Sequence, residues 1–184
     1  AGQFPNMLII AYSAMVVLSC TSCTSVSLEG SNFWIIRSMP VRTSTVFLAK
    51  MSLNVLITLP FVIFSGIVLH FALGLSAVQT FYLIFIPSLY SFLSSQVGLF
   101  INLMVPKMEW TTPMIVVKQS MSVMIDLFVN AVLVAVPTVI FILTQPADVN
   151  RFLLLASGAL IVLNIVCAYL LGSVGKKLYY KIEA

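Results

Sequence analysis

Charged residues are scarce in this chain. Lys, Arg, Asp and Glu make up 8% of its 184 residues, whereas 61% are hydrophobic. A soluble domain usually has about 25% charged residues, because it has to cover its core with polar side chains. The composition therefore excludes an ordinary soluble domain and indicates a membrane protein.

The residues that common chemistries require are also missing. The chain has one histidine, His70, and one aspartate within an apolar run, Asp126. Intramembrane proteolysis would need paired aspartates, a serine with a base, or an H-E-x-x-H motif. A phosphate-binding G-x-x-x-x-G-K-[ST] is absent too, since GSVGKK lacks both its spacing and its hydroxyl. We expect no catalytic residue, no metal ligand and no cofactor on this chain, which is then not an enzyme.

Cysteine is rare, and its three copies are too few for a disulfide framework. Cys20 and Cys23 form C-T-S-C, a spacing that places both on one face of a helix. Serines and threonines surround them, and small residues let transmembrane helices approach closely. Helix packing is the favoured interpretation of this stretch, and a redox or metal site is the alternative.

Long apolar runs are what the sequence has in abundance. Each is about 20 residues or more, enough to cross roughly 30 Å of hydrocarbon as a helix. The runs do not alternate apolar with polar residues, which excludes the strands of a β-barrel. The predicted spans are 7–28, 45–69, 81–104, 121–143 and 152–171. The sequence predicts an all-α integral membrane protein, a single transmembrane domain built as a bundle of five helices.

Basic residues are distributed unevenly between the two ends of these spans. Arg151 lies on one side, and the other eight of the nine basic residues lie on the opposite side. Because basic loops stay in the cytoplasm, the N-terminus is predicted outside and the C-terminus inside. The basic residues thus indicate how the chain is oriented in the membrane, and no nucleic-acid partner is expected.

The start of the chain raises a separate question. It begins AGQFPN, and no basic region of a signal peptide precedes the first apolar run, although that end is predicted to be exported. An upstream span would deliver it across the membrane. We expect the sequence to be the C-terminal part of a longer protein; processing is the alternative.

A basic segment with a tryptophan and a proline, residues 29–44, joins the first two spans. As a helix it would place its apolar side chains on one arc and Trp34 and Arg37 on the other. Pro40 would end that helix, and a hydroxyl within residues 43–45 would cap the next span. The segment is predicted to be a cytoplasmic interfacial helix. Simple anchoring of Trp and Arg at headgroup level is the alternative.

Two segments of the chain resemble those of a known family. The first match comprises Glu29 and Gly30 in SLEGSNFW, Ser38, Pro40 and Val41 in RSMPVR, and Lys50 in FLAK. This pattern is similar to the coupling helix of permease subunits in type 2 ATP-binding-cassette exporters. The second match, INLMVPKMEWTTPMIVVKQS at 101–120, resembles a loop of the large-permease branch of that family.

The resemblance implies spans two to six of a six-span permease unit in a membrane such as the bacterial cytoplasmic membrane. It implies a separate ATPase subunit that binds ATP and Mg and docks against the coupling helix. The expected contact residues are Glu29, Gly30, Trp34, Arg37 and Pro40. Two ATPase subunits and a second permease half, or a homologous permease, would complete the exporter. The short linker at 143–152 leaves little room for the re-entrant helices of several family members.

Polar residues within the spans are few and usually face a bundle interior. Lys50 and Asp126 are expected to form an intramembrane pair, and a substrate contact is the alternative role of Asp126. Asn54, Asn130 and Asn164 are expected to line the same interior as parts of a pathway. None of these residues identifies a cargo.

Two other classes of protein remain open at this point. A membrane scaffold or assembly factor would agree with the low charge of the spans. A channel or secondary transporter would usually show broken helices in repeated halves or rings of charge. Coupling to a separate ATPase distinguishes the permease from both.

Overall fold

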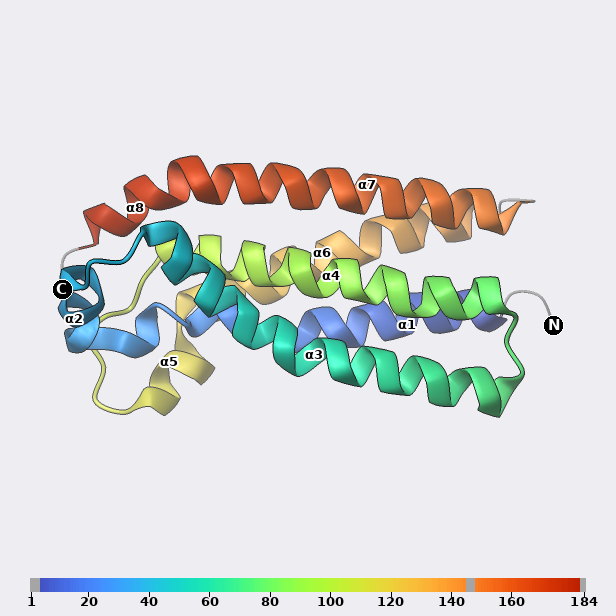
Figure 1. Cartoon of the computed structure of the whole chain (residues 1–184), viewed down its shortest axis with the longest axis horizontal. Helices are drawn as coiled ribbons and strands as arrows, with labels where there is room; N and C mark the ends of the chain where they lie inside the picture. Colours follow the sequence, from blue (N-terminus) through green and yellow to red (C-terminus); the bar gives the residue numbers. More distant parts are fainter. Residues whose placement is uncertain (1–3, 145–147, 183–184) are drawn as a thin grey trace.

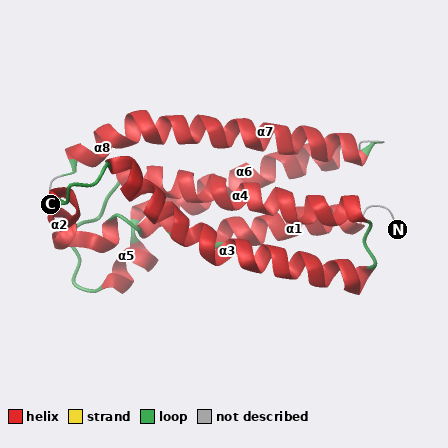
Figure 2. Ribbon diagram, viewed as in Figure 1, coloured by secondary structure: helices red, strands yellow, loops and turns green. Residues whose placement is uncertain are grey.

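The computed structural model describes residues 4–144 and 148–182, and this part of the chain forms a helical bundle (Figure 1). Within these ranges there is no strand (Figure 2). The long helices are α1 (Phe4–Leu18), α3 (Thr43–Leu73), α4 (Ala77–Met104), α6 (Met121–Thr144) and α7 (Val149–Leu170). Five helical segments are long and apolar enough to cross a membrane, which confirms the all-α membrane bundle. The linker at 143–152 lies partly outside the described residues.

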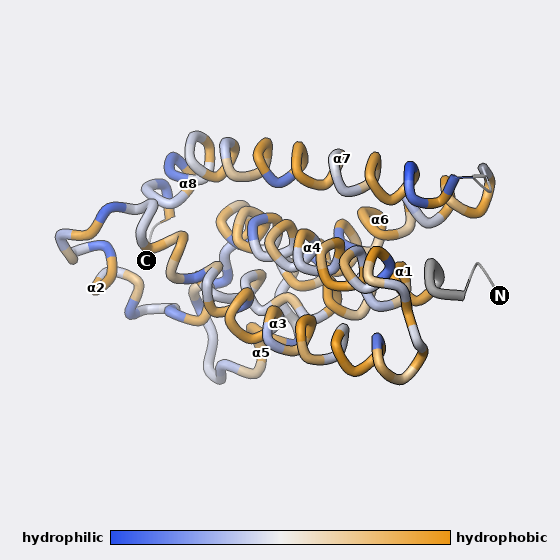
Figure 3. The backbone as a smooth tube through the Cα atoms, turned by 45° about the vertical axis from the view of Figure 1, so that its right-hand side comes forward, coloured by the Kyte–Doolittle hydropathy of each residue, from blue (hydrophilic) through white to orange (hydrophobic). Residues whose placement is uncertain are grey.

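Helix α4 is the centre of the bundle. It packs against α1, α3, α6 and α7 (Figure 1). In the most apolar 18-residue window of α4, 56% is buried inside the bundle. The buried share is 17% in the corresponding windows of α3 and of the segments that contain α6 and α7. The outer helices present large apolar side chains such as Phe61 and Phe64 outward, and hydrophobic residues follow them along most of their length (Figure 3). This pattern suits a bundle surrounded by lipid.

The first predicted span is not one continuous helix. Helix α1 ends at Leu18, and the chain continues through the short turns η1 (Ser22–Thr24) and η2 (Ser27–Asn32). Hydroxyl side chains in this stretch bond to carbonyls three residues back: Ser19 to Val16 at 2.7 Å and Ser25 to Ser22 at 2.9 Å. Such local bonds compete with the helix ladder, so the predicted helix at 7–28 was wrong beyond Leu18.

Three short helices lie at one end of the bundle. They are α2 (Phe33–Ser38), α5 (Pro113–Gln119) and α8 (Lys176–Lys181), and they gather at the left of Figure 1. Tyr179 of α8 makes edge-to-face contacts with Phe33 of α2 and Phe47 of α3, at 5.0 and 5.6 Å between ring centroids. We call this end the basic end, because Arg37, Lys107 and Lys176 all lie there.

Helix α7 reaches α8 through a π-helical turn, η3 (Leu171–Gly175). The helix remains continuous through this turn, with right-handed helical dihedrals on both sides of it. A π turn of this kind accommodates one extra residue within an otherwise regular α-helix. Leu171 at its start and Tyr179 beyond it are both buried.

The start of α3 differs from the prediction. Its N-cap residue is Arg42, whose side chain makes no capping bond. Thr43, one of the predicted capping residues, instead hydrogen-bonds through its hydroxyl to the Tyr180 hydroxyl at 2.9 Å. The C-terminal segment lies close enough to offer this partner, so the hydroxyl ties α3 to α8.

Candidate functional site

The break after α1 leaves backbone groups without helical partners inside an apolar bundle, where each unmet group costs free energy. Asn102 of α4 supplies part of the replacement. Its Oδ1 accepts from the backbone N–H groups of Val26 at 2.8 Å and Ser27 at 3.0 Å. Its Nδ2 donates to the hydroxyls of Ser27 at 2.7 Å and Ser122 at 3.1 Å. One fully buried side chain thus joins the break to α4 and α6.

Asn54 supports the other side of the break from α3. Its Oδ1 accepts from the backbone N–H of Thr21 at 3.1 Å and from the Thr21 hydroxyl at 3.3 Å. Its Nδ2 donates to the Ser91 carbonyl of α4 at 3.4 Å. Asn54 is 0% exposed. The side chain that we expected to line a pathway supports the broken segment, residues 19–32 between α1 and α2.

Lys50 does not pair with Asp126, and that prediction was wrong. Its ammonium donates to the carbonyl of Ser25 at 2.7 Å and forms an ion pair with Glu29. The reason is the break itself. Because the chain unwinds after α1, it brings a free carbonyl and an acidic side chain against α3, and these satisfy the charge of Lys50.

Asn130 and Asp126 lie together on α6, one helical turn apart. The Nδ2 of Asn130 donates to Asp126 Oδ1 at 2.8 Å, and both side chains are buried. Cys20 and Cys23 of the broken segment meet this pair, each offering its Sγ within 4.8 Å of an Asp126 oxygen. Because α1 ends at Leu18, the two cysteines do not share a continuous helix face. No pattern in the sequence predicts their meeting with α6.

Asn164 joins α7 to α4 and is half-buried. Its Nδ2 donates to the carbonyls of Leu89 at 3.3 Å and Leu160 at 2.9 Å, and its Oδ1 accepts from Gln96 Nε2 at 3.2 Å. Both the oxygen and the nitrogen of the amide are therefore hydrogen-bonded. Asn164 lies at a different helix pair from Asn54 and Asn130, so the three asparagines do not face one another.

The two segments singled out in the sequence, 29–44 and 101–120, belong to one structural unit with the turn η2. The indole Nε1 of Trp110 donates to the Ser27 carbonyl at 2.8 Å, and the Lys107 N–H donates to the Ser27 hydroxyl at 3.0 Å. Gly30 has φ of +48°, and a Cβ there would lie 2.8 Å from Trp110 Nε1. Only glycine suits both the backbone conformation and the close approach of the indole.

The predicted contact residues of α2 divide into two groups. Trp34 is 62% exposed and points away from the bundle core. Arg37 donates to the carbonyls of Tyr180 at 3.0 Å and Ile182 at 3.2 Å, and lies 6.0 Å from the centre of the Tyr180 ring. Arg37 therefore holds α2 against the C-terminal segment, whereas Trp34 presents an unused aromatic surface.

Pro40 and Glu29 bound the α2 segment on either side. Met39, the residue before the proline, is extended with ψ of 143°, as expected for a residue in that position. Helix α2 consequently ends at Ser38 before a short turn leads into α3. Glu29 in η2 is held by Lys50, which anchors the chain just before α2 begins.

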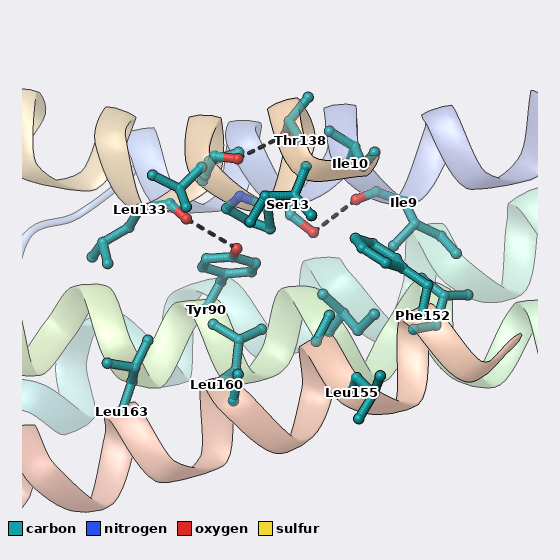
Figure 4. Close-up of a pocket in the computed structure, with 18 of the residues that line it drawn as sticks. Ile9, Ile10, Ser13, Tyr90, Leu133, Thr138, Phe152, Leu155, Leu160 and Leu163 are labelled. Atoms are coloured by element: carbon teal, nitrogen blue, oxygen red, sulfur yellow. Dashed lines mark hydrogen bonds between the residues drawn. The ribbon is translucent and has the colours of Figure 1, made fainter. Parts of the chain in front are cut away.

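The opposite half of the bundle contains an apolar cavity of about 550 Å³ between α1, α4, α6 and α7 (Figure 4). Three polar side chains on its lining bond to the backbone, and one of them, Thr138, donates to the Val134 carbonyl at 2.7 Å. The Ser13 hydroxyl donates to the Ile9 carbonyl at 2.7 Å, and the Tyr90 hydroxyl donates to the Leu133 carbonyl at 3.3 Å (Figure 4). The cavity can accommodate an apolar group and offers little to a polar one.

No protein-family model, curated protein or solved structure matches the chain. The function has to be inferred from the residues and their geometry.

Proposed function

We propose that the chain is the membrane-spanning permease subunit of an ATP-driven exporter, which receives its conformational drive from a separate ATPase. The observation that carries this proposal is the contact of Trp110 with Ser27 beside Gly30. The two segments that resemble permease motifs lie far apart in the sequence, yet this contact joins them. A joint role at the basic end explains why both segments are present.

A mechanical connection leads from α2 to the interior of the bundle. Helix α2 follows directly after η2, and Ser27 in η2 is held by Trp110 and Asn102. Asn102 also bonds to the backbone of Val26 in the broken segment. A displacement of α2 would therefore pass through η2 to the break and to α4, the helix that packs against α1, α3, α6 and α7.

The exposed side chain of Trp34 is the surface that a partner would bind. Large aromatic side chains dominate the binding energy of many protein interfaces. Arg37 positions α2 through its bonds to Tyr180 and Ile182, and Lys50 holds Glu29. In this proposal the basic end faces the cytoplasm, and a second permease unit completes the pathway.

Co-purification tests the proposal directly. The full-length protein is extracted from its own membrane in mild detergent, and the proteins that accompany it are identified by mass spectrometry. We expect an ATP-binding-cassette ATPase with the natural protein and a large loss of it with Trp34→Ala. Phe71→Ala is the matched control, because Phe71 is also an exposed aromatic residue and lies near the C-terminal end of α3, away from the basic end.

Recovery of the folded protein with no such ATPase would refute the permease proposal. A scaffold, or a transporter independent of ATP, would then be the function to pursue. Equal loss of the ATPase with Trp34→Ala and Phe71→Ala would refute the role of Trp34 and leave the ATPase partnership intact.

A further inference from the structure

The broken segment brings two thiols and a carboxylate together inside the bundle. Cys23 lies in η1 and Cys20 just before it, and Asp126 lies on the first turns of α6. The two sulfur atoms and one carboxylate oxygen are all within 4.8 Å of one another. Cys23 and Asp126 are each 4% exposed, so the group is enclosed by protein.

The charge of Asp126 has no positive partner in residues 4–144 and 148–182. The two ion pairs found there join Lys50 to Glu29 and Arg151 to Asp148. A buried carboxylate without a cation is costly, and this cost is greater in a membrane-spanning bundle than at a surface. Asp126 accepts a hydrogen bond from Asn130, which lowers the cost without supplying charge.

The surroundings of the three groups leave them close together and leave one acceptor unused. Gly98 of α4 lies against them, since a Cβ there would be 2.7 Å from Cys20 Sγ and 3.2 Å from Asp126 Oδ1. The Oδ1 of Asn130 is buried and accepts no hydrogen bond within the described part of the chain. An unpaired buried acceptor beside a carboxylate is a feature that a bound cation would explain.

We propose that Cys20, Cys23 and Asp126 bind a zinc ion that clamps the broken segment of the first span to α6. Zinc takes thiolate sulfur and carboxylate oxygen in four-coordinate sites, and thiolates exclude hard cations such as magnesium and calcium. Two thiolates and a carboxylate carry three negative charges, of which a divalent ion cancels two. The fourth position is left for Asn130 Oδ1 or for water. This site is independent of the ATPase partnership proposed above.

Metal binding at this site has to displace protons from the thiols. The Cys20 thiol donates to the Ser94 carbonyl at 3.3 Å, and the Cys23 thiol donates to the Cys20 carbonyl at 3.4 Å. Zinc binds the thiolate form, so both protons are released when the ion enters. The affinity should consequently be higher at pH 8 than at pH 6.

Cobalt spectroscopy on the full-length protein tests the proposal. The protein is purified free of metal under a non-thiol reductant and titrated with Co²⁺. We expect a thiolate-to-cobalt charge-transfer band that saturates at a single cobalt ion per chain and disappears when Zn²⁺ is added. Cys23→Ser and Asp126→Asn should weaken binding at least about tenfold. Cys167→Ser on α7 is the matched control and should bind cobalt like the natural protein.

The natural protein alone can overturn the proposal, because the absence of a thiolate-to-cobalt band would refute it whether or not the variants fold. Binding that is unchanged in Cys20→Ser/Cys23→Ser would refute it as well. A substitution at a buried residue can disturb folding. Asp126→Asn and the serine variants, which keep the side-chain shape, are therefore compared only if they elute as the natural protein does. Loss of binding in the Cys167→Ser control would likewise place the site elsewhere.

Discussion

The two halves of the bundle are held together in different ways. Around the break, fully buried amides bond the unwound chain to the neighbouring helices, and Asn102 alone makes four hydrogen bonds. Around the cavity, the packing residues are aliphatic and aromatic side chains such as Ile9, Leu83 and Leu153. The first half has directional bonds to the unwound chain, whereas the second contains an apolar cavity of about 550 Å³.

This difference shows where the arrangement of the helices is specified. Lipid tails are as apolar as leucine, so apolar side chains gain little by choosing one another over lipid. Directional bonds to an unwound backbone are satisfied in one geometry only. We infer that the half with the break determines the helix arrangement and that the half with the cavity can adapt its shape.

The substitution that should most disturb this contrast is Asn102→Leu. It removes the acceptor for the N–H groups of Val26 and Ser27 and leaves both buried. We expect a loss of about 3 kcal/mol in the free energy of unfolding, measured by thermal unfolding in detergent. Asn150→Leu, at the exposed start of α7, is the control and should change little. Equal stability of the two variants would show that the amide bonds do not specify the arrangement.

A smaller effect is expected at the ion pair between Lys50 and Glu29. Lys50→Met leaves the Glu29 carboxylate and the Ser25 carbonyl without their partner. The side chains are 10% and 17% exposed, so we expect a loss of about 2 kcal/mol, below the range for fully buried pairs. Adding Glu29→Gln should restore part of the loss, since no unpaired charge then remains. A double variant as unstable as the single one would contradict this account.

The smallest effect is expected in the cavity, where the sign should be reversed. Ala156 lines the cavity, and Ala156→Leu would fill part of it. We expect a gain of up to about 1 kcal/mol, seen as a higher unfolding temperature. Ala168→Leu is the control, because Ala168 is exposed on the same helix. A loss of stability with Ala156→Leu would show that this half is packed as specifically as the other.

The sequence predicted the spans well because an apolar run that crosses a membrane has to be as long as the bilayer is thick. The predicted second span, 45–69, became Thr43–Leu73, and the third, 81–104, became Ala77–Met104. The break after Leu18 was missed because serine, threonine and cysteine are common inside transmembrane helices. Their local bonds prevail here only because Asn54 and Asn102 satisfy the freed backbone groups, and those residues come from other helices.

The side-chain pairings were the least predictable part of the candidate site. Lys50 and Asp126 were matched by charge and depth, yet the unwound chain offered Lys50 a nearer acid in Glu29. The meeting of Cys20 and Cys23 with Asp126 depends on the same unwinding. A pairing across helices can be predicted only when the path of the backbone is known, and here the path departs from the regular helix.

The π turn between α7 and α8 lets the helix hold one more residue than regular α-helix would, without turning the part beyond it. Removing one residue from Leu171–Gly175 would restore regular α-helix and leave Tyr179 close to its place against Phe33 and Phe47. Removing one residue from Val149–Leu170 would instead rotate everything beyond it by about 100°, and the carbonyls that bind Arg37 would move with it. This helix should therefore tolerate a single deletion within η3 better than one within α7.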